Sequence, residues 1–157
     1  MSDQALPRPP GSADAPLTLY LVKQLEQVIR ALLDDALRTL GLTTLQYTAL
    51  SVLERRADGL SSAQLARRAF VRPQTMHEMV QALDERGLIE RRHAANNQRV
   101  LLASLSVTGR DLLAQCRPVV QEVENRLLAG MSPQRRDEFR TALEYGHNTL
   151  ADWARSR

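Results

Sequence analysis

The chain has 157 residues, of which 43 % are hydrophobic and 4 % aromatic, with one cysteine and a formal net charge of +3 at pH 7. This length suffices for one domain with a sizeable core, and the aliphatic composition favours a mostly helical one. The single cysteine excludes a framework of internal disulfides, and no apolar run is long enough to cross a bilayer. We therefore expect a cytoplasmic protein that makes no membrane contact.

The N-terminal part divides into a tail and a long helix. Residues 1–15 are rich in Pro, Ala and Ser and lack a hydrophobic signal core, so we expect a disordered tail. From Pro16 to about Leu40, apolar residues recur at helical spacing, and Gly41 is a natural stop. This pattern predicts one amphipathic helix.

Two capping boxes mark the next helices. Thr43 with Gln46, and Ser61 with Gln64, have the spacing at which a hydroxyl and an amide satisfy each other's backbone N–H groups. The first box predicts a helix that ends before the Asp-Gly turn at residues 58–59. The second predicts a short helix from Ser62 to about Ala69.

A fourth helix is expected from Pro73 to just before Gly87, although Arg72 is a poor N-cap. Met76, Val80 and Leu83 form its apolar face. The residues of its polar face are Gln74, Thr75, His77, Glu78 and Gln81. Gln and Thr can bind base edges and phosphates, and a helix fits the major groove, so this face indicates either DNA recognition or an ordinary solvated surface.

A β-hairpin is expected next, because residues 88–93 and 99–105 are short enough for strands and an Asn-containing turn lies between them. It carries Arg92 on its first strand and Arg99 near its tip. An arginine on such a hairpin can enter the minor groove, or it can simply add charge to an edge strand.

Two helices complete the chain. One runs from about Val107 to Ala129, with an expected kink at Pro118, and the last begins at Ser132-Pro133. The last helix has apolar residues alternately four and three apart, as in a coiled-coil seam. These residues are Phe139, Leu143, Gly146, Leu150 and Trp153.

The order of the inner elements is that of a winged helix-turn-helix. Within residues 42–113, the segments LSSAQLARR, RPQTM, LDERGLIERR and LSVTG stand in an order and spacing that resembles the multiple antibiotic resistance regulator (MarR) family. The resemblance implies a mostly α (α+β) fold, with a DNA-binding lobe at 42–106 and helical dimerisation regions at 16–41 and 107–157. It implies a transcriptional regulator, most often a repressor, that binds a pseudo-palindromic double-stranded operator as a homodimer.

The resemblance also assigns a DNA-binding surface. The fourth helix becomes the recognition helix, the start of the third helix lies near phosphate, and Arg99 becomes the wing arginine. Asn97 departs from the Asp that the family often has there, and Arg72 departs from the usual Ser or Thr cap. The expected DNA-binding residues are Ser61, Ser62, Arg72, Gln74, Thr75, His77, Glu78, Gln81, Arg92 and Arg99.

A small aromatic effector is also implied by the resemblance. Many members of the family release DNA when a phenolic or aromatic carboxylate compound binds between the outer helices and the DNA-binding lobe. Polar or aromatic residues that could line such a cleft are Tyr20, Gln24, Tyr47 and Arg117, although each also fits ordinary packing or a solvated helix surface.

Other function classes have weaker support. The three histidines are scattered and no phosphate-binding Gly-rich motif is present, so we expect no enzymatic activity, no metal and no cofactor. Cys116 lies in the apolar stripe of the fifth helix, which is typical of inert packing, with redox sensing as an alternative. A winged-helix module for protein contacts without DNA is a further alternative.

Overall fold

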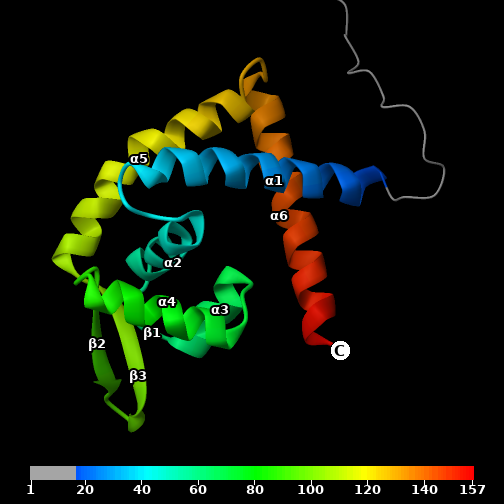
Figure 1. The fold of residues 1–157 in the computed structure, drawn as a ribbon. Helices are drawn as coiled ribbons and strands as arrows, with labels where there is room; N and C mark the ends of the chain where they lie inside the picture. The colour runs from blue at the N-terminus through cyan, green and yellow to red at the C-terminus, as the bar shows by residue number, and fades with distance from the viewer. Residues whose placement is uncertain (1–16) are drawn as a thin grey trace, which may run out of the picture.

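The computed structural model describes residues 17–157 as helices arranged around a small antiparallel sheet (Figure 1). The expectations for the tail at 1–15 and for Pro16 lie outside the described residues. In chain order the elements are α1 (Leu17–Arg38), α2 (Thr44–Glu54), β1 (Leu60–Ser61), α3 (Ser62–Ala69), α4 (Pro73–Glu85), β2 (Ile89–Ala94), β3 (Asn97–Leu105), α5 (Val107–Leu127) and α6 (Pro133–Arg155). The order and type of the expected elements are confirmed, with β1 as an addition.

Local capping explains where the inner helices begin. At α2 the Gln46 N–H donates to Thr43 Oγ1 over 3.2 Å, and the Thr43 N–H donates to Gln46 Oε1 over 3.1 Å. Ser61 and Gln64 form the same reciprocal pair at α3. Arg72 makes no side-chain cap at α4, as its type predicts, so this helix begins on the fixed backbone of Pro73 alone.

The sheet has the strand order β1-β3-β2 and is antiparallel throughout. The two residues of β1 pair with β3, Leu60 opposite Ala103 and Ser61 opposite Leu102. Gly59 permits this pairing, because its φ is +80° and a Cβ there would lie 2.8 Å from the Ala103 carbonyl oxygen. A strand of two residues has no periodicity, so the sequence pattern could not predict it.

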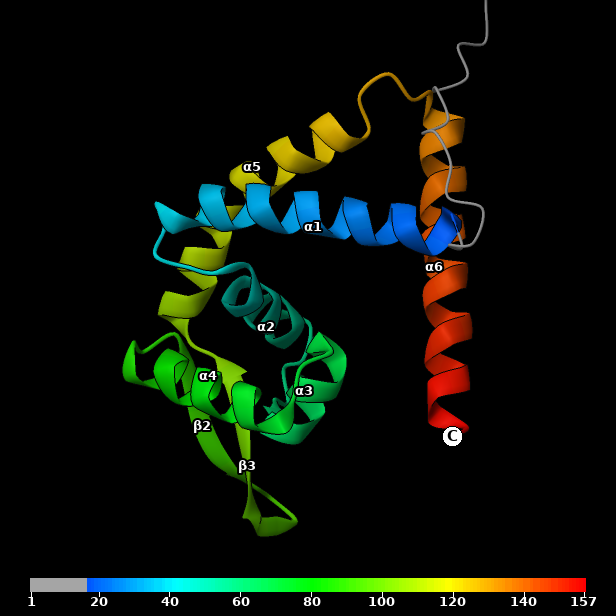
Figure 2. The same ribbon diagram turned by 45° about the vertical axis from the view of Figure 1, so that its right-hand side comes forward.

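One aliphatic core joins the inner elements to the outer helices. Leu50, Leu65 and Leu83 from α2, α3 and α4 are fully buried in it. Leu37 of α1 and Leu113 of α5 belong to the same core, and Figures 1 and 2 show both helices crossing beside α2. The recognition helix is therefore packed into the same hydrophobic unit as the helices expected to dimerise.

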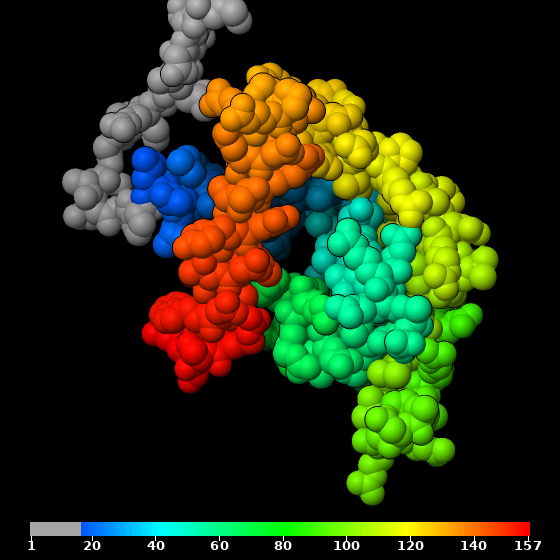
Figure 3. All heavy atoms as spheres, turned by 180° about the vertical axis from the view of Figure 1, so that it is seen from behind, coloured from blue at the N-terminus to red at the C-terminus, as the bar shows by residue number. Residues whose placement is uncertain are grey.

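The helix α6 differs from the other helices in residues 17–157, because none of its side chains is buried. Figure 2 shows it descending beside the rest of the molecule, and Figure 3 shows it exposed along its length. Leu143, Leu150 and Trp153 of the expected seam are 44 %, 56 % and 56 % exposed. Pro118 lies inside α5, which changes direction along its length in Figure 1, in agreement with the expected kink.

The junction between α4, β2 and α5 is built on a buried serine. Ser106 is the N-cap of α5: its hydroxyl accepts from the Gly109 N–H over 3.0 Å and donates to the Gly87 carbonyl over 2.6 Å. A Cβ on Gly109 would lie 2.1 Å from the Leu88 carbonyl oxygen. The first turn of α5 can approach β2 this closely only because residue 109 has no side chain.

We predict that Gly109→Ala destabilises the protein by about 3 kcal/mol, because the added methyl must push α5 away from the Leu88 carbonyl. Urea denaturation followed by circular dichroism measures the free energy of unfolding. Thr108→Ala, at the exposed preceding position, is the control and should change it by less than about half a kcal/mol. Equal stability of the two variants would contradict the close approach.

Candidate DNA-binding surface and effector pocket

The helix α4 separates its two faces cleanly. Met76, Met79, Val80 and Leu83 are buried against the core. The five residues of the expected polar face are all exposed: Gln74, Thr75, His77, Glu78 and Gln81. Within this face the Gln74 Nε2 donates to Glu78 Oε1 over 2.9 Å. The surface that can enter a groove is thus polar, exposed and partly preorganised.

The start of α3 places Ser61 and Ser62 beside the N-terminal end of a helix, where backbone N–H groups favour an anion. Both side chains are half-buried, and the Ser61 oxygen already accepts from Gln64. Arg72 is exposed at the start of α4. These positions suit phosphate contacts, and their role in DNA binding stays a prediction.

The wing is the hairpin formed by β2 and β3. Its register passes from the pair His93–Leu101 directly to the pair Ala94–Asn97, so residues 98–100 are extra on β3. Arg99 lies in this bulged stretch and is exposed. Asn97 Oδ1 accepts from the Arg99 N–H over 3.0 Å, which confirms that the Asn97 side chain supports the turn through the backbone.

Two other arginines of the wing have protein partners. Arg92 Nη2 donates to the Asp58 carbonyl over 3.2 Å, while its side chain stays exposed. Arg91 lies 3.7 Å from the Asp84 carboxylate of α4 and is only 23 % exposed, so it ties the wing to the recognition helix. The sequence analysis did not single out Arg91 or Asp84, because nothing local joins them.

An open cavity of about 910 Å³ lies between α1, α2, the end of α3 and α6. Its apolar wall includes Leu25, Ile29, Leu45, Val71 and Leu143. Its polar residues include Glu26, Arg30, Asp34, Arg38, Thr44 and Thr48. The cavity therefore offers apolar surface together with two guanidinium groups and a row of hydroxyls.

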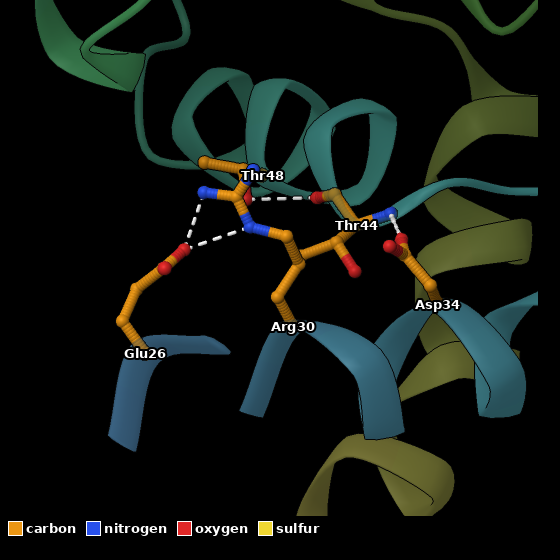
Figure 4. Close-up of polar contacts among 5 residues, drawn as sticks. All are labelled: Glu26, Arg30, Asp34, Thr44 and Thr48. Carbon is orange, nitrogen blue, oxygen red and sulfur yellow. Dashed lines mark hydrogen bonds and ion pairs between the residues drawn. The ribbon is translucent and has the colours of Figure 1, made fainter. Parts of the chain in front are cut away.

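Figure 4 shows how the polar side of the cavity is arranged. Arg30 Nε donates to Glu26 Oε1 over 2.7 Å, and the Thr44 N–H donates to Asp34 Oδ1 over 2.8 Å. Thr48 Oγ1 donates to the Thr44 carbonyl over 2.9 Å. The buried Thr44 hydroxyl makes no hydrogen bond of ordinary geometry within the described residues. A buried hydroxyl without a partner is costly, so it can reward a ligand that supplies one.

Asp34 links the two halves of this site, because it lies on α1 and caps the first turn of α2. The Thr44 side chain nearby and the Thr44 N–H bond lower the pKa of Asp34 below its ordinary value. The carboxylate is therefore charged at neutral pH. Its capping contribution is present at neutral pH and is lost as the pH falls below the ordinary aspartate range.

The connection from α3 to α4 forms one edge of the cavity. Phe70 ends α3 in a left-handed conformation, with φ of +55°, and its ring is 73 % exposed. It packs edge-on against the His147 ring of α6, with 5.6 Å between ring centroids. A bulky residue with positive φ is uncommon, and here the chain turns at this residue from the cavity towards α4.

The four ligand residues expected from sequence do not line this cavity. Gln24 Nε2 donates to the exposed Tyr20 hydroxyl over 2.7 Å, Tyr47 packs against the core, and Arg117 pairs with Glu54. Their role stays a prediction. The cavity residues on α1 gave no sequence signal, because Glu26 and Arg30 four residues apart resemble an ordinary surface ion pair.

Cys116 is fully buried, and burial raises the pKa of its thiol. A protonated, enclosed thiol reacts slowly with oxidants, which favours packing over redox sensing. No group of three potential metal ligands lies together within residues 17–157. No helix in the same range is both long and apolar enough to cross a membrane.

A three-helix core with a two-stranded wing defines a winged helix-turn-helix protein, a class whose recognition helix reads the major groove. The MarR family model matches residues 40–99. The chain is 37 % identical over 131 residues to the transcriptional repressor Rv2887 of Mycobacterium tuberculosis, covering 83 % of this chain and 93 % of the relative. The protein belongs to the MarR family and is a DNA-binding transcriptional regulator.

Solved structures agree with this assignment. A MarR-family regulator from Rhodococcus sp. RHA1 superimposes with a TM-score of 0.78 at 21 % identity, covering 90 % of this chain and 96 % of that chain, and shows the fold. Rv2887 solved with salicylic acid is 36 % identical with a TM-score of 0.69, covering 85 % and 97 %. The family is one of regulators, and the absence of any catalytic activity stays a prediction.

We predict that Arg99→Ala weakens binding to many DNA sequences alike and lowers the salt dependence by about one counterion per lost phosphate contact. The bulge presents Arg99 to solvent, so the free energy of unfolding should change by less than about half a kcal/mol. Fluorescence anisotropy across a salt titration measures the slope. Arg126→Ala on α5 removes an equal charge elsewhere and should leave the slope unchanged.

Proposed function

We propose that the protein is a homodimeric repressor that places α4 of each protomer in the major groove of a pseudo-palindromic operator. The observation that carries the proposal is the division of α4 into a buried apolar face and an exposed polar face beside a bulged, arginine-bearing wing. The half-sites are then about one helical turn apart, ~10 bp. The repressor acts in the cytoplasm, where it meets the chromosome.

The dimer is supported by apolar surface that one protomer leaves uncovered. On α1, Leu21, Val28 and Leu32 are each about half exposed, and on α6 so are Leu150 and Trp153. Exposed apolar side chains at regular helical spacing on two long helices indicate an interface with another helical surface. A second copy of the chain offers the matching faces.

We further propose that the cavity beside Arg30 and Thr44 binds a small aromatic carboxylate or phenol that releases the operator. The apolar wall suits a ring, the Arg30 and Arg38 guanidinium groups suit a carboxylate, and the Thr44 hydroxyl lacks a partner. Rv2887, the relative solved with salicylic acid, supports this chemical class.

Release follows from where the cavity lies. Ala69, Phe70 and Val71 line it and lead directly into Arg72 and α4. A ligand that prefers one position of this connection biases the position of α4, and so the fit of the two recognition helices to the operator.

We predict that the unmodified chain is a dimer at micromolar concentration, and that Leu150→Asp dissociates it or unfolds it by placing a charge in the seam. Sedimentation equilibrium measures the mass, and circular dichroism separates dissociation from unfolding. Asn148→Asp, an exposed polar position outside the seam, is the control and should stay dimeric. A folded monomer of the unmodified chain would contradict the dimer.

We predict that salicylate weakens operator binding by roughly tenfold, and that Thr44→Val reduces this effect. Because the Thr44 hydroxyl is buried without a partner, its removal should leave the stability unchanged or raise it, while salicylate binding weakens about tenfold. Isothermal titration calorimetry and anisotropy give both affinities. Thr48→Val removes a hydroxyl that already has a partner and so should lower stability. Equal salicylate affinity of Thr44→Val and the unmodified chain would contradict the site.

A further inference from the structure

The exposed face of α4 contains one residue that is out of place on a surface built for DNA. Among its five polar residues Glu78 alone is negatively charged, and it lies at the centre of the face with Gln74 and Gln81 one turn before and after it. A carboxylate near phosphates is repelled. Such a group weakens binding to all DNA unless a hydrogen-bond donor in the groove meets it.

The Glu78 carboxylate is held in one orientation by its neighbour. Gln74 Nε2 donates to Glu78 Oε1 over 2.9 Å, which leaves the second carboxylate oxygen free as an acceptor. Both residues lie in the first half of α4, the part of a recognition helix that contacts base edges. The pair therefore presents a fixed acceptor to the groove in place of a mobile charge.

We propose that Glu78 determines sequence specificity by accepting a hydrogen bond from the 4-amino group of one cytosine in each half-site, with Gln74 as the positioning residue. In the major groove cytosine presents an amino donor, whereas thymine O4 and guanine O6 at the same place are acceptors that a carboxylate repels. The proposal deepens the proposed function and rests on the entry of α4 into the major groove.

The same side-chain pair elsewhere in the chain shows what the hydrogen bond alone is worth. On α6, Gln134 Nε2 donates to Glu138 Oε1 over 2.9 Å, also just after a proline that begins the helix. That pair lies on a helix outside the helix-turn-helix. The hydrogen bond is thus an ordinary helix contact, and its place on α4 gives Glu78 its role. Glu138→Gln is accordingly a matched control for Glu78→Gln.

The experiment selects bound duplexes from a random double-stranded library with the unmodified chain, Glu78→Gln and Glu138→Gln. The unmodified chain and Glu138→Gln should select a site with one cytosine per half-site that Glu78→Gln no longer requires. Anisotropy on synthetic duplexes then compares cytosine with thymine at that position. The unmodified chain should lose about tenfold in affinity, and Glu78→Gln less than threefold.

A second readout separates base reading from charge. Loss of the negative charge should raise the affinity of Glu78→Gln for unrelated duplex DNA by roughly threefold, because repulsion from phosphates is removed. Gln74→Ala keeps the charge but frees the carboxylate, so it should reduce the discrimination between cytosine and thymine without raising affinity for unrelated DNA.

The possible failures are distinguishable. If the unmodified chain selects no site, the proposed function fails and the inference fails with it. If it selects a site that Glu78→Gln shares unchanged at every position, Glu78 is a solvated residue, and the inference is overturned while the proposed function stands. If the altered position is an adenine, the assignment to cytosine is overturned. Circular dichroism on all variants shows whether a change in selection reflects unfolding.

Discussion

The close approach of α5 to β2 at Gly109 is the constraint on which the DNA-binding half of the molecule depends. At this point the end of α4, the start of the wing and the first turn of α5 meet around the Ser106 hydroxyl, which bonds to Gly87 and Gly109. The Gly109 N–H and the missing Cβ let α5 lie against the Leu88 carbonyl. One junction thus sets the end of the recognition helix and the direction in which the wing leaves the core.

The outer helices are joined to the same unit by the shared core and by the cavity. Leu37 and Leu113 bring α1 and α5 into the core of the lobe, and Asp34 caps α2 from α1. Phe70 meets His147 of α6 exactly where the chain leaves the cavity for α4. A change in the outer helices therefore reaches α4 through packed contacts over a few residues, which is the arrangement that a ligand-controlled regulator needs.

The charges on the DNA-binding surface are distributed between attraction and discrimination. Arg99 projects from a bulge with its backbone held by Asn97, whereas Arg91 is drawn back to Asp84 and serves the wing's attachment. Between residues 54 and 99 there are nine basic and six acidic residues, so the net attraction to DNA is modest. In such a surface, the placement of individual groups such as Glu78 matters more than total charge.

The sequence by itself determined the helices, their caps and the polar face of α4, because those features depend on residues within one or two turns. The reciprocal bonds of Thr43 with Gln46 and of Ser61 with Gln64 are local, as is the division of α4 between Met76 and Gln74. Only the tertiary structure decided the pairing of β1 with β3, the bulge that holds Arg99, and the cavity with its lone Thr44 hydroxyl. Each of these joins residues distant in the chain, and no local spacing encodes which distant surfaces meet.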